Sequence, residues 1–577
     1  MMMNAPSTSR ESNRRRAKKP KVKTGCVTCK IRRVKCDETR PQCLRCQKFG
    51  EGYCDGYEPA QVESIQNRPA INRSATSAVI QNSTPKREPV IRVFRSQDEF
   101  CCFRFYCEEV APQLSSSNRS IWHQLLLQAG QSQPFIRHAI IAIGALNRSL
   151  RDPSTVPISD KGRASMVLGG HYPVASSVRA FALEHYDKFL EGAKGTMSLM
   201  GRGEVRRTAM IVCLLVVCIE NMQYRYSNAL EHAQNGLRLM EELRSDIPNA
   251  KEPNGMSSPI PNIIEDEIIQ QYHRMELQVM AMYDARTPSE HTRLKQEGSA
   301  SIKDMPELFT SLEQARLYLD LVMRRTYHFM GYALADGSAF LKFSQDVRQS
   351  SSKEENLPKD ISSWLRDAPE ELQVEQEMYA AENRRWALAF EPMFRVALRN
   401  IERVESIRFL LLKIHSLTMT VRLAGHLSKS EMVYDTFMSE FKQIIFLADV
   451  VLKHRHVHKF FAGGAFSFDM GLIYPLMTPA MSCRDRTLRR EAIALLFIRP
   501  WREAQWHSQT SADIAQFLME VEEEGVETAD IPEWARARLS GVIADLEKRS
   551  LHLYCIRGVG ENTTQRDSLR YYFVAEE

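Results

Sequence analysis

Residues 26–54 read CVTCKIRRVKCDETRPQCLRCQKFGEGYC and hold six of the 13 cysteines in this 577-residue chain. The six fall into two similar halves in tandem, with the spacings C-x2-C-x6-C and C-x2-C-x7-C. No histidine precedes His123, so a metal held by this stretch would be coordinated by sulfur alone. The N-terminus lacks the apolar run of a secretory signal, and clustered cysteines in a reducing compartment are metal ligands more often than disulfides.

The spacing predicts a site for two zinc ions. Two tetrahedral Zn²⁺ ions need eight ligand positions, which six thiolates fill when two of them bridge. The symmetric choice of bridging residues is the first cysteine of each half, Cys26 and Cys43. About 30 residues cannot fold without such a staple, so the metal also holds the fold. The predicted ligands are Cys26, Cys29, Cys36, Cys43, Cys46 and Cys54.

Between the second and third cysteines lies the basic run KIRRVK, residues 30–35. As a short helix it places Ile31 and Val34 on one face and four cations on the rest. A metal-pinned basic helix fits the major groove of double-stranded DNA, where arginine grips guanine and lysine reaches guanine or phosphate. A merely solvated charged face is the alternative. The residues predicted to contact DNA are Lys30, Arg32, Arg33 and Lys35.

This segment closely resembles the fungal Zn2Cys6 binuclear-cluster family of transcription factors. The resemblance rests on the six cysteines, the CKIRRVKC run and Pro41 two residues before Cys43. It implies two short helices folded around two zinc ions and recognition of a CGG-type DNA triplet. By position, Arg32 and Arg33 would read bases, Lys30 and Lys35 would mostly contact phosphate, and Pro41 would shape the loop between the halves.

Charge separates the head of the chain from the rest. Residues 1–60 hold 15 Lys and Arg against 6 Asp and Glu, whereas the remaining 517 residues hold 62 and 65. A polyanion partner is therefore expected for the head only. Residues 1–25 are predicted to form a basic disordered arm whose stretch 14–23 is a nuclear import signal. Residues 57–95, with four prolines and no apolar heptads, are predicted to be a flexible linker.

Residues 96–577 are predicted to form one large all-α domain, because apolar residues recur there at helical spacing. No apolar run is long enough to cross a membrane, the longest being the 11 residues 209–219. Residues 551–556 and 569–574 are predicted to pair as a small hairpin. The helical stretches lie near 135–146, 178–190, 230–240, 263–283, 307–334, 375–400, 401–425, 432–455, 487–497, 509–524 and 532–548.

The helical part resembles, more loosely, the regulatory region that accompanies this cluster in many filamentous-fungal regulators. The matching stretches are 93–105, 135–146 and above all 483–508. Within the last of them Arg502, Glu503 and Trp506 are interpreted as a structural corner rather than a ligand site, because no second convergent group is visible. The nearby aromatic cluster is interpreted as core, with an effector pocket as the alternative; its members are Phe460, Phe461, Phe466 and Phe468.

The predicted fold class is therefore a small Zn2Cys6 domain at residues 26–56, joined by a flexible linker to a large all-α domain. No catalytic motif supports an enzyme. The favoured function is a nuclear, sequence-specific regulator of RNA polymerase II genes, controlling a metabolic or secondary-metabolite gene set. Its partners would be double-stranded DNA and the transcription machinery or co-regulators. A homodimer, if formed, would use the helical domain. The competing hypothesis is a zinc-dependent RING-like adaptor.

Overall fold

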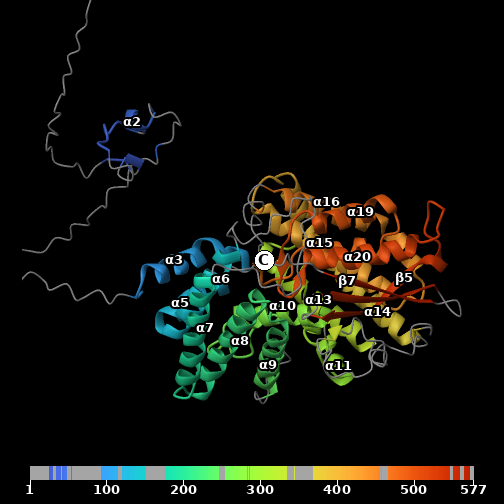
Figure 1. Cartoon of the computed structure of the whole chain (residues 1–577), viewed down its shortest axis with the longest axis horizontal. Coiled ribbons are helices and arrows are strands. Elements are labelled where there is room, and N and C mark those ends of the chain that lie inside the picture. Colours follow the sequence, from blue (N-terminus) through green and yellow to red (C-terminus); the bar gives the residue numbers. More distant parts are fainter. Residues whose placement is uncertain are drawn as a thin grey trace, which may run out of the picture. The chain divides into compact units, whose positions relative to one another are not determined.

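The computed structural model divides the chain into two compact units, Met1–Val90 and Ile91–Glu577 (Figure 1). The arm predicted for residues 1–25 and the linker predicted for 57–95 lie almost wholly outside the described residues. The structure describes residues 25–26, 28–29, 34–40, 42–47, 54, 93–114, 120–150, 176–245, 254–282, 284, 286–333, 343–344, 368–454, 457, 466–545, 550–558 and 564–571.

In the N-terminal unit, the cysteines themselves form the core. All six are buried, and Val34 is the partly buried apolar side chain that packs against them. The helix α2 (Leu44–Gln47) carries Cys46 on its buried side, while Leu44 is exposed. So small a hydrophobic content agrees with a fold that depends on metal.

The second unit begins with a group of helices that share one core. Ile136, Ile140 and Ile143 of α6 are fully buried there, as their spacing predicted. The elements are α3 (Gln97–Phe105), η1 (Tyr106–Val110), α4 (Ala111–Leu114), η2 (Ser120–Leu125), α5 (Leu126–Ser132), α6 (Pro134–Leu150), α7 (Ser176–Met197), α8 (Arg202–Met222), α9 (Tyr226–Ser245) and α10 (Asp266–Met282).

A second group of helices surrounds a larger core that contains Trp386 and Trp501, both fully buried. In α19, Ala492, Leu495 and Leu496 face inward as predicted. The elements are α11 (Pro288–Gln296), α12 (Ser299–Lys303), α13 (Leu312–Ala333), α14 (Glu370–Leu398), α15 (Ser406–His426), η5 (Glu431–Phe437), α16 (Met438–Lys453), α18 (Ile473–Ser482), α19 (Arg486–Phe497) and α20 (Ser508–Glu523). Among the described helices, none combines the length and the apolar character that crossing a bilayer would require.

The second unit also contains a four-stranded sheet of order β1-β5-β6-β7. Its strands are β1 (Phe343–Ser344), β5 (Ala537–Asp545), β6 (Ser550–Arg557) and β7 (Thr564–Tyr571), with η6 (Glu533–Ala535) before β5. The hairpin predicted for residues 551–556 and 569–574 is present as the antiparallel pair β6 and β7, but its second strand begins earlier, at Thr564, and residues 572–574 lie outside the described part of the chain.

The prediction of a helix at 532–548 is wrong, because the described residues of this stretch form η6 and β5. Val542 of β5 packs in a separate small core with Leu551 and Leu553 of β6 and with Phe517 of α20. A short apolar run fits a helix or a strand equally well by periodicity, and here the pairing with β6 decides.

Three short strands, β2 (Phe466–Ser467), β3 (Arg502–Glu503) and β4 (Trp506–His507), form a buried corner that joins the two helical groups. The Phe468 N–H donates to the Leu114 carbonyl at 2.9 Å, and the Arg502 guanidinium donates to the Asn221 carbonyl at 3.1 Å. The Glu503 carboxylate accepts hydrogen bonds from the N–H groups of Gly471, Leu472 and Ile473, which lead into α18, at 2.7–3.0 Å. These bonds favour the structural interpretation of the corner.

Candidate metal centre and nucleic-acid interface

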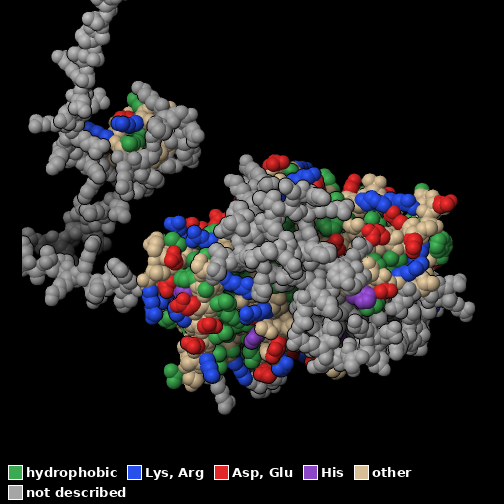
Figure 2. Space-filling view, viewed as in Figure 1, with side chains coloured by type: hydrophobic (Ala, Val, Ile, Leu, Met, Phe, Trp, Pro, Cys, Tyr) green, Lys and Arg blue, Asp and Glu red, His purple; other side chains and the backbone are tan. Residues whose placement is uncertain are grey.

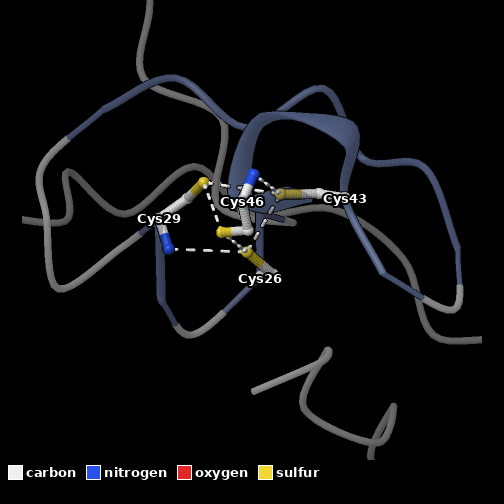
Figure 3. Close-up of side chains that lie close together, drawn as sticks. All are labelled: Cys26, Cys29, Cys43 and Cys46. Carbon is white, nitrogen blue, oxygen red and sulfur yellow. Dashed lines mark hydrogen bonds between the residues drawn. The ribbon is translucent and has the colours of Figure 1, made fainter. Parts of the chain in front are cut away.

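Four cysteine sulfurs converge in the N-terminal unit. Figure 3 shows the side chains of Cys26, Cys29, Cys43 and Cys46 turned toward one another, and their sulfurs all lie within 4.8 Å. The Sγ atom of Cys26 lies 3.7 Å from that of Cys43 and 3.9 Å from that of Cys46. The Sγ atom of Cys29 lies 3.7 Å from each of the same two atoms. A ZnS4 tetrahedron with Zn–S bonds of about 2.3 Å has edges of about 3.8 Å. The four sulfurs therefore have the spacing of thiolates around zinc, and those of Cys26 and Cys43, the predicted bridging pair, are 3.7 Å apart.

The remaining two thiols adjoin this group. Cys54 is within hydrogen-bonding reach of Cys26, and Cys36 is within reach of Cys29. The Cys26 N–H donates to the Cys36 sulfur at 3.4 Å. All six predicted ligands are thus gathered at one place, as a binuclear cluster requires.

The two halves repeat the same local geometry. The Cys29 N–H donates to the Cys26 sulfur at 3.4 Å, and the Cys46 N–H donates to the Cys43 sulfur at 3.3 Å. Each C-x2-C segment therefore forms one turn in which the first sulfur accepts a backbone hydrogen bond. Such bonds favour the thiolate form that metals bind.

Burial opposes that charge when no metal is present. It raises the pKa of the Cys26 and Cys29 thiols and raises the pKa of Cys43 to about 12. Neutral thiols would persist at pH 7, so Zn²⁺ must displace their protons when it binds. The buried sulfurs and the metal therefore stabilise one another.

The residues around these sulfurs match a known family. Residues 24–63 fit the fungal Zn(2)-Cys(6) binuclear cluster domain. The chain contains a Zn2Cys6 domain. This domain binds two zinc ions, and the six buried cysteines are the thiols available to hold them.

Curated relatives extend the match beyond the Zn2Cys6 domain. The aspercryptin biosynthesis cluster-specific transcription regulator of Emericella nidulans is 23% identical over 358 residues, which cover 59% of this chain and 53% of that protein. The transcription regulator lscL of Purpureocillium lilacinum is 25% identical over 231 residues, covering 38% and 49%. The transcriptional regulatory protein moc3 of Schizosaccharomyces pombe is 56% identical over 49 residues, covering 8% and 9%.

The chain thus spans about half the length of the first two relatives. No solved structure matches the chain.

Asp37 is a residue of the Zn2Cys6 domain that sequence reasoning missed. Its carboxylate accepts hydrogen bonds from the Leu44 N–H at 3.0 Å and the Arg45 N–H at 2.7 Å, at the start of α2. It also accepts from the Thr39 hydroxyl at 2.6 Å. The Thr39 hydroxyl and the backbone N–H groups lower the pKa of Asp37, so the carboxylate stays charged. It ties the loop after Cys36 to the helix of the second half. Its signal, an Asp seven residues before a helix, is not a local capping pattern.

Gly25 is the second such residue. A methyl group at position 25 would lie 2.9 Å from Cβ of Cys36, closer than ordinary contact. The backbone can therefore approach Cys36 only because residue 25 has no side chain. Farther along the loop, Glu38 adopts a positive φ of 64°, a strained conformation for a non-glycine residue.

Of the predicted DNA contacts, the structure describes only Lys35. Its side chain is exposed, and its carbonyl accepts a hydrogen bond from the Arg45 guanidinium at 3.3 Å. This bond ties the backbone of Lys35 to α2. Lys30, Arg32 and Arg33 lie outside the described residues, so their roles remain predictions.

Proposed function

We propose that the chain is a sequence-specific DNA-binding regulator of RNA polymerase II transcription that reads CGG-type triplets with its Zn2Cys6 domain. The observation that carries the proposal is the six-cysteine cluster, whose second and third cysteines flank the basic run 30–35 in the sequence. The cluster fixes both ends of this run, because Cys29 and Cys36 flank it and are both buried. A short cationic segment held in this way can enter the major groove without first losing backbone entropy.

The charge distribution supports a single DNA-binding unit. On the face of the helical unit seen in Figure 2, described Lys and Arg side chains are interspersed with Asp and Glu. The excess of positive charge lies instead in residues 1–60. Since phosphate contacts supply most non-specific affinity, the helical unit serves regulation rather than DNA contact.

The relatives indicate the biological setting. Each of the three relatives described above is named as a transcription regulator, and one is named for a biosynthesis cluster. We infer a nuclear protein, imported through residues 14–23, that controls a metabolic or secondary-metabolite gene set. It acts with the transcription machinery or co-regulators and catalyses no reaction.

Binding of the zinc-loaded full chain to a duplex containing CGG, compared with a scrambled duplex at moderate salt, tests the proposal. Arg33→Ala should cost about 1–3 kcal/mol on the CGG duplex and relax preference at one base pair. Lys35→Ala and Lys30→Ala should weaken binding to both duplexes alike and flatten the salt dependence by about one unit each. Exposed Gln42→Ala is the matched control within the domain.

Equal affinity for the CGG and scrambled duplexes would overturn the proposal. Zinc binding without any DNA affinity would instead favour the RING-like adaptor. The sequence supports that alternative less well, because RING-like sites usually need more ligands, often including histidine, spread over a longer stretch.

A further inference from the structure

The long helix α14, labelled in Figure 1, has two apolar faces. One face is buried and includes Tyr379, Trp386, Phe390 and Phe394. A surface helix needs only one such face to pack on its own core. The second face is exposed, and an exposed apolar surface of this kind marks a contact with another molecule.

We call this second face the α14 stripe. Its larger members are strongly exposed: Val374 by 66%, Met378 by 46%, Leu388 by 74% and Val396 by 59%. Exposed Ala381 and Pro392 complete it. Successive members are 4, 3, 7, 4 and 4 residues apart, close to the 3.5-residue spacing by which two helices pack side by side. The stripe extends over 22 residues, or about 33 Å of helix.

A neighbouring loop widens the stripe at its centre. The Phe309 N–H donates to the Ala389 carbonyl at 3.4 Å, so the loop that carries Leu308 lies against this part of α14. Leu308 is itself 60% exposed. The loop therefore adds a second large, exposed aliphatic side chain close to the part of the helix that carries Leu388, where the core of an interface would lie.

The charges along α14 identify the partner. Its first half carries the exposed acids Glu370 and Glu371 together with Glu377, which pairs with Arg384. Its second half carries Arg395, which pairs with Glu391 at 2.9 Å, and is followed by the exposed Arg399 at the C-cap. A second copy of the helix, turned end to end, would bring each acidic half against a basic half. With Val374 opposite Val396, the same register places Glu371 opposite Arg399.

We propose that the α14 stripe is a homodimer interface, in which two copies of α14 pack antiparallel about a two-fold axis. A two-fold interface must be complementary to itself, and the opposed acidic and basic halves of one helix satisfy this condition. Met378 then packs against Pro392 of the second copy, and the two Leu388 side chains flank the axis.

Arg385 lies closest to the axis, where two like charges would otherwise meet. Its guanidinium is instead directed to the end of α12, donating to the carbonyls of Ile302 at 3.0 Å and Lys303 at 3.2 Å and also to that of Met305. Those three bonds hold its charge against carbonyl oxygens of its own chain and away from the second copy.

The inference does not depend on DNA binding, because assembly is measured without DNA. Sedimentation of the full chain at micromolar concentration should show a dimer. Leu388→Glu should raise the dissociation constant roughly 100-fold, about tenfold for each of the two copies that a two-fold axis brings together. Phe446→Glu, at a side chain 58% exposed on α16, is the matched control and should leave the dimer intact.

A charge exchange tests the orientation. Arg399→Glu should weaken the dimer, and adding Glu371→Arg in the same chain should restore it. Failure of this restoration would overturn the antiparallel register. A monomeric wild-type chain, or equal effects of the two Glu substitutions at positions 388 and 446, would overturn the interface. If Leu388→Glu lowered thermal stability without changing the sedimenting mass of the assembly, the stripe would be covered by its own chain. That result would also overturn the proposed interface.

Discussion

Replacing Gly25 by alanine should loosen the zinc cluster without touching a ligand. The added methyl group would lie 2.9 Å from Cβ of Cys36, whereas ordinary contacts begin at 3.4 Å, so the two groups must move apart by about half an ångström. The displaced residue is Cys36 itself, whose sulfur accepts the Cys26 N–H at 3.4 Å. The strain is therefore transmitted directly to two predicted zinc ligands.

The magnitude follows from the cost of overpacking a small core, about 1–3 kcal/mol. Since metal binding and folding are coupled in such a domain, this cost appears in zinc affinity. At about 1.4 kcal/mol for each factor of ten, zinc should be held roughly 5- to 150-fold more weakly.

Competition of the zinc-loaded full chain with a chromophoric chelator measures this affinity. The chelator concentration that removes half of the zinc should be lower for Gly25→Ala than for the wild type. It should stay unchanged for Gln42→Ala, whose side chain is exposed beside Cys43. An unchanged midpoint for Gly25→Ala would refute the argument that close approach at residue 25 shapes the cluster. Two zinc ions per chain should be found in both proteins before the chelator is added.

Two further predictions concern the helical unit and are read by thermal unfolding. Gly144→Ala would place a methyl group 2.2 Å from the Cys102 carbonyl oxygen and should lower the free energy of unfolding by at least about 1–3 kcal/mol. Gly195→Ala in α7 meets nothing within 4 Å and should raise the free energy of unfolding by about 0.5–1 kcal/mol. Shifts of the same sign in the two variants would contradict this prediction. Glu522→Gln, which weakens the buried pairing with Arg484 and Arg489, should cost about 3–5 kcal/mol near neutral pH. Burial alone would raise the Glu522 pKa, but the two arginines bring it below its ordinary value of 4.5. The charged form therefore stabilises the wild type above that value, and this stability is lost as pH falls through the lower folded pKa. The stability of the variant should therefore fall less steeply than that of the wild type as the pH is lowered. The same dependence of stability on acidic pH in both proteins would contradict the pairing.

The cluster was predictable because its chemistry is local in sequence. Cysteine is the residue type that supplies thiolates, and two C-x2-C turns can each chelate one metal without help from distant residues. The spacing from Cys26 to Cys54 therefore carried the metal count and the predicted ligand set. The buried face of α6 was predictable for the same reason, because the residues that form one face of a helix all come from one short stretch of the chain.

What supports the cluster was not readable. Gly25 and Asp37 act on partners 11 and 7–8 residues away, and neither position shows its role until the loop has folded. The same limit explains β5, whose residues 537–545 carry a pattern that a helix or a strand can satisfy. Only pairing with β6 and packing against α20 decide between them.

The sequence by itself determined the metal centre, the basic run beside it and the helical character of the rest, because each depends on neighbouring residues. The tertiary structure alone decided which face is buried where a helix carries two apolar faces. In α14 both faces are apolar, and the sequence gives no reason to prefer either. Packing against the helical core buries the face with Trp386 and leaves the face with Leu388 exposed. Burial is a property of the neighbours that surround a helix, and those neighbours come from parts of the chain far apart in sequence.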